Sequence, residues 1–466
     1  MAYKDLREFI AACRADGDCL EIDRPVKADC EIGWALKKSY SNGGPLMMFN
    51  HVVDNEGKEK KYPAVGGVYG CREKAVKAFQ TDAAHIFEKF NYGLNHPIAP
   101  VMYKGAAPCQ EVVLTGDEIN LDDLPIPKFS CLDGGYYITA GITVSKDPET
   151  GISDIGHYRY MVHDKKTLGV MAQPFHRFGK NTWKAVRMGK DVIQAAIILG
   201  VDPIIAYSCP LTGIPDSVDD WTLAGGLRQE PVELVKCKTV DLEVPAYAEM
   251  IIEIEVDLKQ TKSEGPLGEF TGYFTPASDK FVAHVKCITH RKDPLFQVVM
   301  TGKPTPVTEN HVLKQLGNEA SIFHYLKSQF PGVTDVSLPC SGGCQERLVV
   351  SMKQRFAGEA RQVALYAMGS DLRPKTVIIV DTDINVHDSS EVEWALAYRM
   401  QPAKDIFIIP SVPGGPCDPS NRTEGKLISF NDTMGIDATC PYGSDYAVVA
   451  DAPGWQDYDF PELMKR

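Results

Sequence analysis

Hydrophobic residues near the start of the chain recur at three- and four-residue intervals, a spacing that is typical of one face of a helix. They are Leu6, Phe9, Ile10 and Cys13. Residues 75–90 follow a helical spacing as well, and short strand-like stretches separate the helical segments. The pattern predicts an N-terminal α/β region over residues 1–108.

From about residue 110 the pattern changes to short apolar stretches that are rich in β-branched and aromatic residues, as strands are. These stretches are 136–146, 156–163, 168–173, 192–199, 232–242, 249–256 and 296–300. Many strands with few helices indicate a barrel. We therefore predict a split β-barrel domain over residues 109–303.

Beyond residue 304 helical and strand-like patterns alternate, which favours an α/β domain over residues 304–466, including a C-terminal tail. Residues 358–368 are predicted to form a helix that Gly369 closes, because glycine suits a helix C-cap. Ser389 and Ser390 are predicted to cap the next helix. The fold class is thus α/β (α+β), with a β-rich centre between two mixed regions.

Composition narrows the class of protein. The chain has 466 residues, is 44% hydrophobic and carries a formal net charge of −13, which argues against a general nucleic-acid binder. We expect no membrane span and no signal peptide, because neither a long apolar run nor an apolar N-terminal segment is present. The 13 cysteines then indicate reduced thiols in the cytoplasm. Cys340 and Cys344 have a spacing compatible with zinc but no further ligand pair nearby, so zinc is disfavoured.

The segment from Glu264 to Glu269, with the sequence EGPLGE, is the most informative stretch of the chain. Five residues separate its two glutamates, which suits neither one face of a helix nor one face of a flat strand. Glycine and proline between them indicate a bend, and a bend can bring both carboxylates into one pocket. Paired carboxylates in a pocket shift each other's pKa and perform proton chemistry. A solvated acidic loop is the alternative interpretation.

Three other segments carry polar residues suited to ligand binding. Arg159 offers a planar fork for a carboxylate, although taken alone a structural ion pair with a neighbouring aspartate in the barrel is the better explanation. Asp154, His176 and Asp220 would together form a site for a hard cation, and the single imidazole favours Mn²⁺ over Mg²⁺. Taken singly, His176 is more typical of a structural histidine and Asp220 of a solvated turn.

In this order, these motifs resemble the UbiD-like decarboxylases, which use prenylated FMN, and the resemblance covers almost the whole chain. The family signature is a glutamate, then a Gly-Pro-containing segment, a second acid and a Gly-Tyr pair. Here it corresponds to Glu264 through Glu269 followed by Gly272 and Tyr273. Two positions depart from the family pattern, because Asp154 replaces the usual asparagine and Asp220 the usual glutamate.

The resemblance implies a role for each of these residues. Glu264, Arg159 and Glu269 correspond to the family's catalytic triad, with Glu269 as the proton donor. The implied metal ligands, for Mn²⁺ or Mg²⁺ with K⁺ as a possible neighbour, are Asp154, His176 and Asp220. The implied cofactor-binding residues are Asp154, Arg159, Gln173, His176, Asp220 and Lys426. Phe175 is expected to lie against a flat substrate ring.

The implied activity is the reversible, non-oxidative decarboxylation of an aromatic or heteroaromatic carboxylic acid, with CO2 as the other reactant. The sequence shows no long apolar tunnel motif, which favours a small aromatic acid. A prenyl-FMN-forming enzyme is implied as the cofactor source, and a homodimer or higher homo-oligomer as the assembly. Two alternatives stay open: a hydrolase, metal-assisted or a glycosidase, that uses Glu264 and Glu269 as its acid pair, and a non-catalytic flavin-binding split barrel.

Overall fold

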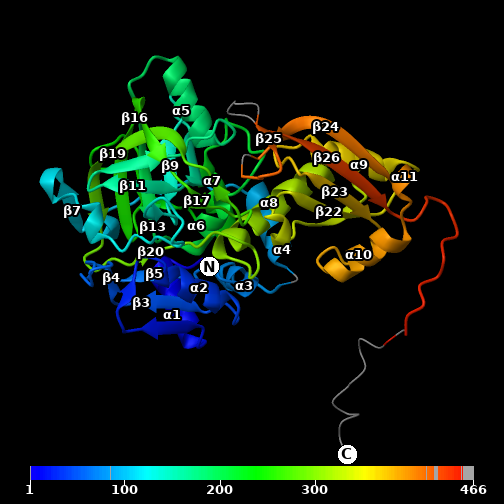
Figure 1. The fold of residues 1–466 in the computed structure, drawn as a ribbon, viewed down its shortest axis with the longest axis horizontal. Coiled ribbons are helices and arrows are strands. Elements are labelled where there is room, and N and C mark those ends of the chain that lie inside the picture. The colour runs from blue at the N-terminus through cyan, green and yellow to red at the C-terminus, as the bar shows by residue number, and fades with distance from the viewer. Residues whose placement is uncertain (1, 84, 416, 424–428, 453, 455–466) are drawn as a thin grey trace, which may run out of the picture.

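The structure is a computed structural model, and it describes residues 2–83, 85–415, 417–423, 429–452 and 454. Figure 1 shows two lobes: the N-terminal and central parts of the chain form the larger one, and the C-terminal part forms the smaller one. A mixed α/β fold with a curled, β-rich centre confirms the predicted fold class.

The N-terminal region packs helices against a small sheet. The predicted stripe lies on α1 (Leu6–Ala15), where Asp5 caps the first turn and all four apolar residues are buried. The sheet has the order β1-β3-β5-β20, so that a strand from much later in the chain completes it. Its strands are β1 (Cys19–Ile22), β3 (Leu46–Phe49), β5 (Ala64–Gly66) and β20 (Phe296–Gln297).

One prediction for this region is wrong. Residues 75–90 do not form one helix but belong to two, α3 (Arg72–Ala78) and α4 (Ile86–Asn95). Phe79 ends the first helix, and Gln80 takes a positive φ of 48°. Two of the three phenylalanine rings of this segment stay in contact, with the Phe79 and Phe90 centroids 5.5 Å apart, so the apolar pattern reflects a shared core rather than a shared helix. The other elements here are α2 (Glu31–Tyr40), β2 (Val26–Lys27) and β4 (Val52–Val53).

The centre of the larger lobe is a nine-stranded, antiparallel sheet that curls on itself. Its order is β10-β9-β13-β16-β19-β12-β11-β8, and β7 pairs with β19. The strands are β7 (Val112–Thr115), β8 (Tyr137–Ile138), β9 (Ile142–Lys146), β10 (Ser153–His157), β11 (Tyr160–Asp164), β12 (Thr167–Val170), β13 (Val192–Leu199), β16 (Met250–Glu264) and β19 (Ser278–His290). The long strands β16 and β19 pair at the centre of this half-barrel, and Glu264 is the last residue of β16.

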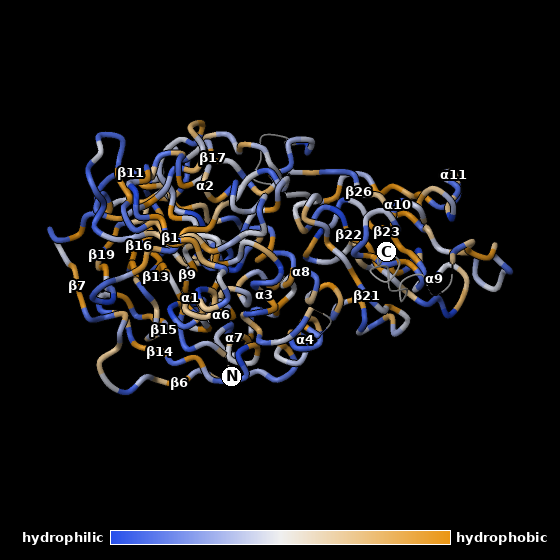
Figure 2. The backbone as a smooth tube through the Cα atoms, turned by 90° about the horizontal axis from the view of Figure 1, so that it is seen from below, coloured by the Kyte–Doolittle hydropathy of each residue, from blue (hydrophilic) through white to orange (hydrophobic). Residues whose placement is uncertain are grey.

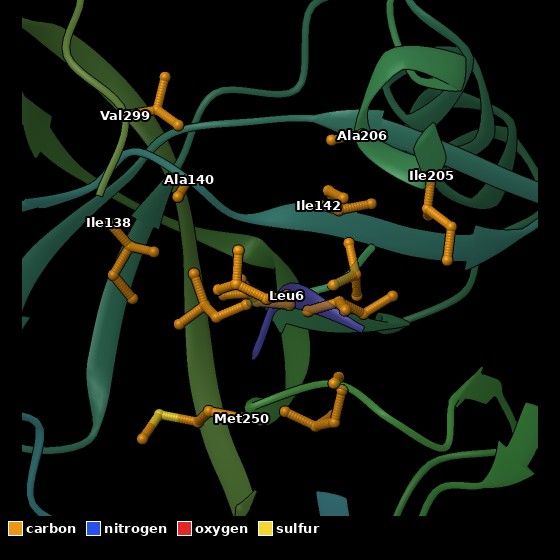
Figure 3. Close-up of a cluster of buried hydrophobic side chains, with 14 of the residues drawn as sticks. Leu6, Ile138, Ala140, Ile142, Ile205, Ala206, Met250 and Val299 are labelled. Atoms are coloured by element: carbon orange, nitrogen blue, oxygen red, sulfur yellow. The ribbon is translucent and has the colours of Figure 1, made fainter. Parts of the chain in front are cut away.

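Helices and short strands cover this sheet. They are β6 (Val101–Met102), α5 (Arg177–Arg187), α6 (Pro203–Ser208), α7 (Asp220–Arg228), β14 (Glu233–Lys236), β15 (Glu243–Pro245), β17 (Leu267–Gly268) and β18 (Phe274–Thr275). Figure 3 shows Leu6 of α1 in one cluster with Ile142 of β9 and Met250 of β16, which ties the N-terminal region to the sheet. Figure 2 shows the matching pattern, with hydrophobic segments inside the two lobes and hydrophilic segments on the outer loops.

The smaller lobe is an α/β layer with the sheet order β21-β22-β23-β26-β24 and β25 paired with β26. The strands are β21 (Val333–Ser337), β22 (Arg347–Met352), β23 (Thr376–Val380), β24 (Ile406–Gly414), β25 (Arg422–Thr423) and β26 (Ser429–Ala438). The helices are α8 (Glu309–Lys327), α9 (Glu359–Met368), α10 (Ser389–Tyr398) and α11 (Pro402–Asp405). Helix α8 contacts α4 and α6 on one side and β21 and α9 on the other, so it joins the lobes.

Two sequence predictions are settled in the smaller lobe. Gly369 does close α9, as predicted. Ser389 and Ser390 do not cap α10; Asp388 does, because its carboxylate accepts a hydrogen bond from the Ser390 backbone N–H at 2.8 Å. In the described part of the chain, no helix has both the length and the hydrophobicity that crossing a membrane requires.

Candidate active site

A tight turn at the end of β16 places two glutamates beside one arginine. Gly265 has a φ of 99°, which glycine adopts without strain, and the Gly265–Pro266 peptide bond is cis. The Gly134 backbone N–H donates to the Pro266 carbonyl at 2.7 Å, and this holds the turn against a neighbouring loop. Chain direction reverses again between β17 and β18, where Gly268 pairs with Phe274. The bend expected from glycine and proline is therefore present.

Arg159 lies immediately before β11 and contacts both carboxylates. Its Nε donates to Glu264 Oε1 at 3.2 Å, and its Nη1 is in direct contact with Glu269 Oε1. Its Nη2 lies 3.4 Å from the Thr275 hydroxyl on β18. One guanidinium thus bridges the end of β16 and the loop after β17, and the structure brings together all three residues of the predicted triad.

The two glutamates have different surroundings. Glu264 is only 1% exposed, and burial raises the pKa of its carboxyl group while Arg159 and Lys280 lower it. Its Oε2 is buried and has no hydrogen-bond partner among the described residues. Glu269 is less buried, with 14% of its side chain exposed. The geometry therefore gives one enclosed carboxylate that orients the arginine and one that a ligand can reach.

A second acidic group lies at the other end of β10. Asp154 is on β10 and Asp220 is the first residue of α7, where its Oδ2 accepts a hydrogen bond from the Ile155 backbone N–H at 3.0 Å. Arg177, the first residue of α5, contacts both: its Nε is 3.8 Å from Asp154 Oδ1, and its Nη1 touches Asp220 Oδ1. The neighbouring Asp219 caps α7 instead, since its side chain accepts from the Trp221 N–H.

These two carboxylates carry more negative charge than one arginine neutralises. Burial raises the pKa of Asp154, and the proximity of Asp220 raises it further. Burial raises the pKa of Asp220 too, while Arg177 opposes that shift. A buried group of two acids and one base favours an additional cation or a proton. Asp154 and Asp220 are therefore candidates for holding a cation, and Arg177 supplies one positive charge between them.

His176 does not join this pair to form a three-residue cluster. In the parts of the chain that the structure describes, no group of three or more histidine, cysteine, aspartate or glutamate side chains is close enough to hold a metal ion. His176 is exposed, next to the Tyr158 ring at a centroid distance of 6.3 Å. Partial exclusion of water lowers the pKa of its imidazole, and Arg373 and Lys314 lower it further. Of the three predicted ligands, the structure brings two together.

The other predicted binding residues lie on or beside the same segment. Phe175 packs under the guanidinium of Arg373, which is 4.6 Å from the ring centroid, so this segment faces the smaller lobe. Gln173 lies against Gly179, where a Cβ atom would meet the Gln173 carbonyl oxygen at 1.6 Å. Lys426 lies outside the described residues.

Charged residues from the smaller lobe and α8 complete the surroundings, and sequence patterns did not point to them. Phe270 directly follows Glu269 in the chain, and Lys314 Nζ lies 3.3 Å from the centroid of its ring. Arg373 has a buried Nη1 without a hydrogen-bond partner in the described ranges. The Thr271 hydroxyl donates to the Cys417 carbonyl at 2.9 Å, which links the loop after Glu269 to the smaller lobe. The site thus lies where the two lobes meet.

A separate cavity of about 460 Å³ lies near the N-terminus and contains none of these residues. Its wall includes the ion pair of Arg228 with Asp202, which is buried. The cavity is lined mainly by the first residues of the chain and by the segment from Arg228 to Glu233. We therefore assign it no part in the candidate active site.

Comparisons with known proteins identify the family of this chain. Profiles of the 3-octaprenyl-4-hydroxybenzoate carboxy-lyase family match three successive segments: the N-terminal domain over residues 10–92, the Rift-related domain over 101–304 and the C-terminal domain over 311–438. An uncharacterized protein of Archaeoglobus fulgidus is 32% identical over 456 residues, which cover 94% of this chain and 92% of that protein. A second, from Aquifex aeolicus, is 34% identical over 469 residues with the same coverage.

Solved structures share the fold over the whole chain. The UbiD-class enzyme HmfF from Pelotomaculum thermopropionicum, in complex with FMN, has a TM-score of 0.87 at 31% identity and covers 98% of this chain and 99% of its own. An evolved dimeric form of HmfF in complex with prFMN has a TM-score of 0.86 at 30% identity and covers 99% and 100%. The closed form of vanillic acid decarboxylase from Sedimentibacter hydroxybenzoicus has a TM-score of 0.89 at 28% identity and covers both chains fully. Three successive family domains, relatives matched along nearly their whole length and a shared fold show that this chain belongs to the UbiD family of carboxy-lyases.

Proposed function

We propose that this protein catalyses the reversible, non-oxidative decarboxylation of a small aromatic or heteroaromatic carboxylic acid with prenylated FMN as its cofactor. The observation that carries the proposal is the contact of Arg159 with both Glu264 and Glu269. HmfF binds FMN or prFMN in its solved structures, and the vanillic acid decarboxylase is named for an aromatic acid.

The surroundings of the triad fit an anionic cofactor. Lys280, Lys314 and Arg373 surround the junction of the lobes, and burial lowers the pKa of all three, so an anion that neutralised them would be favoured. Gln173, His176 and Lys426 are the further cofactor-binding residues in the proposal. When bound, prenylated FMN supplies the electron sink that an aromatic ring lacks when CO2 leaves.

The protein's own residues then have three tasks. Arg159 orients the substrate carboxylate, because its planar fork matches two oxygens at once. Glu264 holds Arg159 in place from the enclosed side, as its buried carboxylate contacts Nε. Glu269 delivers the proton to the ring carbon, since it is the more accessible carboxylate. Phe175 provides a flat surface for the aromatic ring.

We propose that Asp154 and Asp220 bind Mn²⁺ or Mg²⁺ beside the cofactor phosphate, with K⁺ as a possible second ion. The excess of buried negative charge supports a cation there. Joining His176 to the ion requires a local change around α5, because its imidazole does not lie with the two carboxylates. The metal's task would be to hold the phosphate end of the cofactor, away from the reacting carbon.

The two alternative functions have less support. A glycosidase or hydrolase needs one carboxyl group free to activate water, and here both glutamates pair with the same arginine. A non-catalytic flavin-binding barrel would not need both carboxylates on Arg159. Flavin-like absorbance with CO2 release separates all three.

The decisive experiment is co-expression with a prenyl-FMN-forming enzyme, followed by a panel of aromatic acids scored for CO2 release. The Arg159→Met variant, purified from the same co-expression, is the matched control. We expect at least one small aromatic acid to lose CO2 in the wild type and none in the variant. Loaded wild-type protein that releases CO2 from no member of the panel would contradict the proposal.

We also propose that the protein self-associates at least as a dimer. The tail after Ala438 leaves the smaller lobe, as Figure 1 shows, and exposes Tyr442, Tyr446 and Val448. Exposed apolar segments of this kind favour burial against a partner. Light scattering at micromolar concentration tests this, and a monomer would contradict it.

A further inference from the structure

Two buried polar atoms next to the triad lack hydrogen-bond partners among the described residues. They are Oε2 of Glu264 and Nε2 of His163. Buried polar atoms without a partner cost free energy, so each such atom calls for an explanation. No sequence pattern drew attention to His163, which is one of 11 histidines in the chain.

Both atoms border the same small space, above Gly169 on β12. A Cβ atom at Gly169 would lie 2.9 Å from His163 Nε2 and 3.2 Å from Glu264 Oε2. The separation between His163 Nε2 and Glu264 Oε2 is therefore no larger than the sum of these two distances. One side-chain rotation, or one water molecule, spans such a separation.

Strand geometry explains how His163 comes to lie there. Met161 of β11 pairs with Gly169 of β12, and the pairing shifts by one residue between Val162 and Asp164. His163 is the residue at this bulge. Bulges change the direction in which a side chain points and occur often beside active sites.

We propose that His163 is a positioning residue for Glu264: its Nε2 and the free carboxylate oxygen share a hydrogen bond across the space above Gly169, directly or through one water molecule. This inference deepens the proposed function and rests on it for its catalytic consequence. With both oxygens held, Glu264 keeps Oε1 on the Arg159 guanidinium. Arg159 then stays aligned with Glu269.

The charged and titratable groups around the pair are consistent with a neutral imidazole. Glu264 faces Arg159 before β11, Lys280 of β19 and Tyr137 of β8. His163 faces Lys262 of β16 and its neighbour Asp164. Burial lowers the pKa of His163, Lys262 lowers it further, and Asp164 opposes the shift. A neutral imidazole still carries one N–H, which is enough for the proposed hydrogen bond.

The first test needs no cofactor, so it is independent of the proposed function. The imidazole of His163 is titrated by NMR in the cofactor-free protein, with its signal assigned by its loss in His163→Gln. Glu264→Gln removes a neighbouring anion and should lower the pKa of His163 by about one unit. Lys262→Gln removes a neighbouring cation and should raise it, which shows that the signal reports on nearby charge. A titration that Glu264→Gln leaves unchanged while Lys262→Gln moves it overturns the proposal.

The second test uses the cofactor-loaded enzyme and separates positioning from packing. His163→Leu should lower kcat about tenfold, the effect expected from losing a hydrogen bond to a charged group, while His163→Gln keeps an N–H and should stay within about threefold. Gly169→Ala keeps both partners but fills the space between them, and it should behave like His163→Leu. His284→Leu, at an exposed histidine of the same sheet, is the control and should match the wild type.

The outcomes distinguish the two hypotheses. If the wild type decarboxylates no substrate, the proposed function fails, and the NMR result alone decides whether His163 and Glu264 are coupled. If the wild type is active but His163→Leu and His163→Gln have the same kcat and pH profile, His163 has no positioning role.

Discussion

The molecule contains two acidic groups, each bridged by one arginine, near opposite ends of strand β10. At one, Arg159 contacts Glu264 and Glu269. At the other, Arg177 contacts Asp154 and Asp220. The charges are the same, but the positions of the acids differ. The first pair comes from one short turn, whereas the second comes from a strand and a helix that are far apart in the sequence.

The two groups therefore differ in how their carboxylates are held and how far they are buried. The turn between Glu264 and Glu269 is held by a hydrogen bond from the Gly134 backbone N–H, and its arginine leaves one carboxylate enclosed and the other accessible. At the second group both carboxylates are buried, and the pKa of each is raised. These surroundings are consistent with the roles proposed above, proton transfer to an organic substrate at the first group and cation binding at the second.

The strongest test of the first group is Glu269→Gln. The amide keeps the shape of the side chain but removes the proton that the reaction needs. We expect turnover to fall by at least about 10²-fold, because general acid–base catalysis contributes about 10²–10⁴-fold. Cofactor loading, measured by absorbance, should stay at the wild-type level, since the phosphate end of the site is unchanged. Near-wild-type CO2 release by the fully loaded variant would return Glu269 to the role of a loop carboxylate.

Arg159→Met tests whether the first group also stabilises the fold. The substitution leaves Glu264 charged and buried without its cation, and we expect a loss of about 3 kcal/mol in the free energy of unfolding. Urea denaturation at neutral pH measures it. Adding Glu264→Gln to Arg159→Met should recover part of the loss, because no buried charge then remains. Equal stability of the single variant and the wild type would show that Lys280 alone neutralises Glu264.

Sequence reasoning succeeded where the structure depends on nearby residues. The turn after Glu264 follows from glycine and proline, strand β13 from an apolar run at residues 192–199, and the end of α9 from Gly369. These features need only local sterics, and an apolar run long enough for one strand.

Sequence reasoning gave wrong predictions, or none, where segments that are distant in the chain meet. Nothing local indicates that Arg177 lies between Asp154 and Asp220, because α5 and α7 come together only in the folded chain. Arg373 over Phe175 requires the packing of the two lobes. The family resemblance implied the triad and the metal ligands. It contained no information about Arg177, which contacts both Asp154 and Asp220. Tertiary contacts of this kind are set by the whole core and leave no short-range pattern.

Arg177→Gln tests the second group directly. Without the guanidinium, the two buried carboxylates lose their only paired cation among the described residues, and we expect about 2 kcal/mol lower stability in metal-free buffer. Millimolar Mn²⁺ should then raise the melting temperature of the variant more than that of the wild type, because binding to the folded state stabilises it. Lys180→Gln removes an exposed cation of the same helix and is the control. If Mn²⁺ shifts all three proteins equally, or none, Arg177 does not compete with a metal.

Asp154→Asn tests the sign of the pH dependence at the second group, with the smallest expected effect. The pKa of Asp154 is raised in the folded state, so the folded chain binds a proton more tightly than the unfolded chain, in which the pKa of aspartate is about 3.9. Its contribution to stability is therefore most favourable at low pH and is lost as the pH rises towards the folded-state pKa. Between pH 5 and 8 the wild type should lose about 1 kcal/mol or more relative to Asp154→Asn.

Urea denaturation of both proteins at the two pH values measures this loss, with Asp122→Asn at an exposed position as the control. Added Mn²⁺ sharpens the result, because a metal ion that binds the carboxylates displaces the proton. In its presence the wild type should no longer lose stability between pH 5 and 8, whereas Asp154→Asn should respond less. Parallel pH curves for the wild type and Asp154→Asn in metal-free buffer would mean that Arg177 fully neutralises the pair. The contrast between the two arginine-bridged groups would then be one of position alone, not of charge.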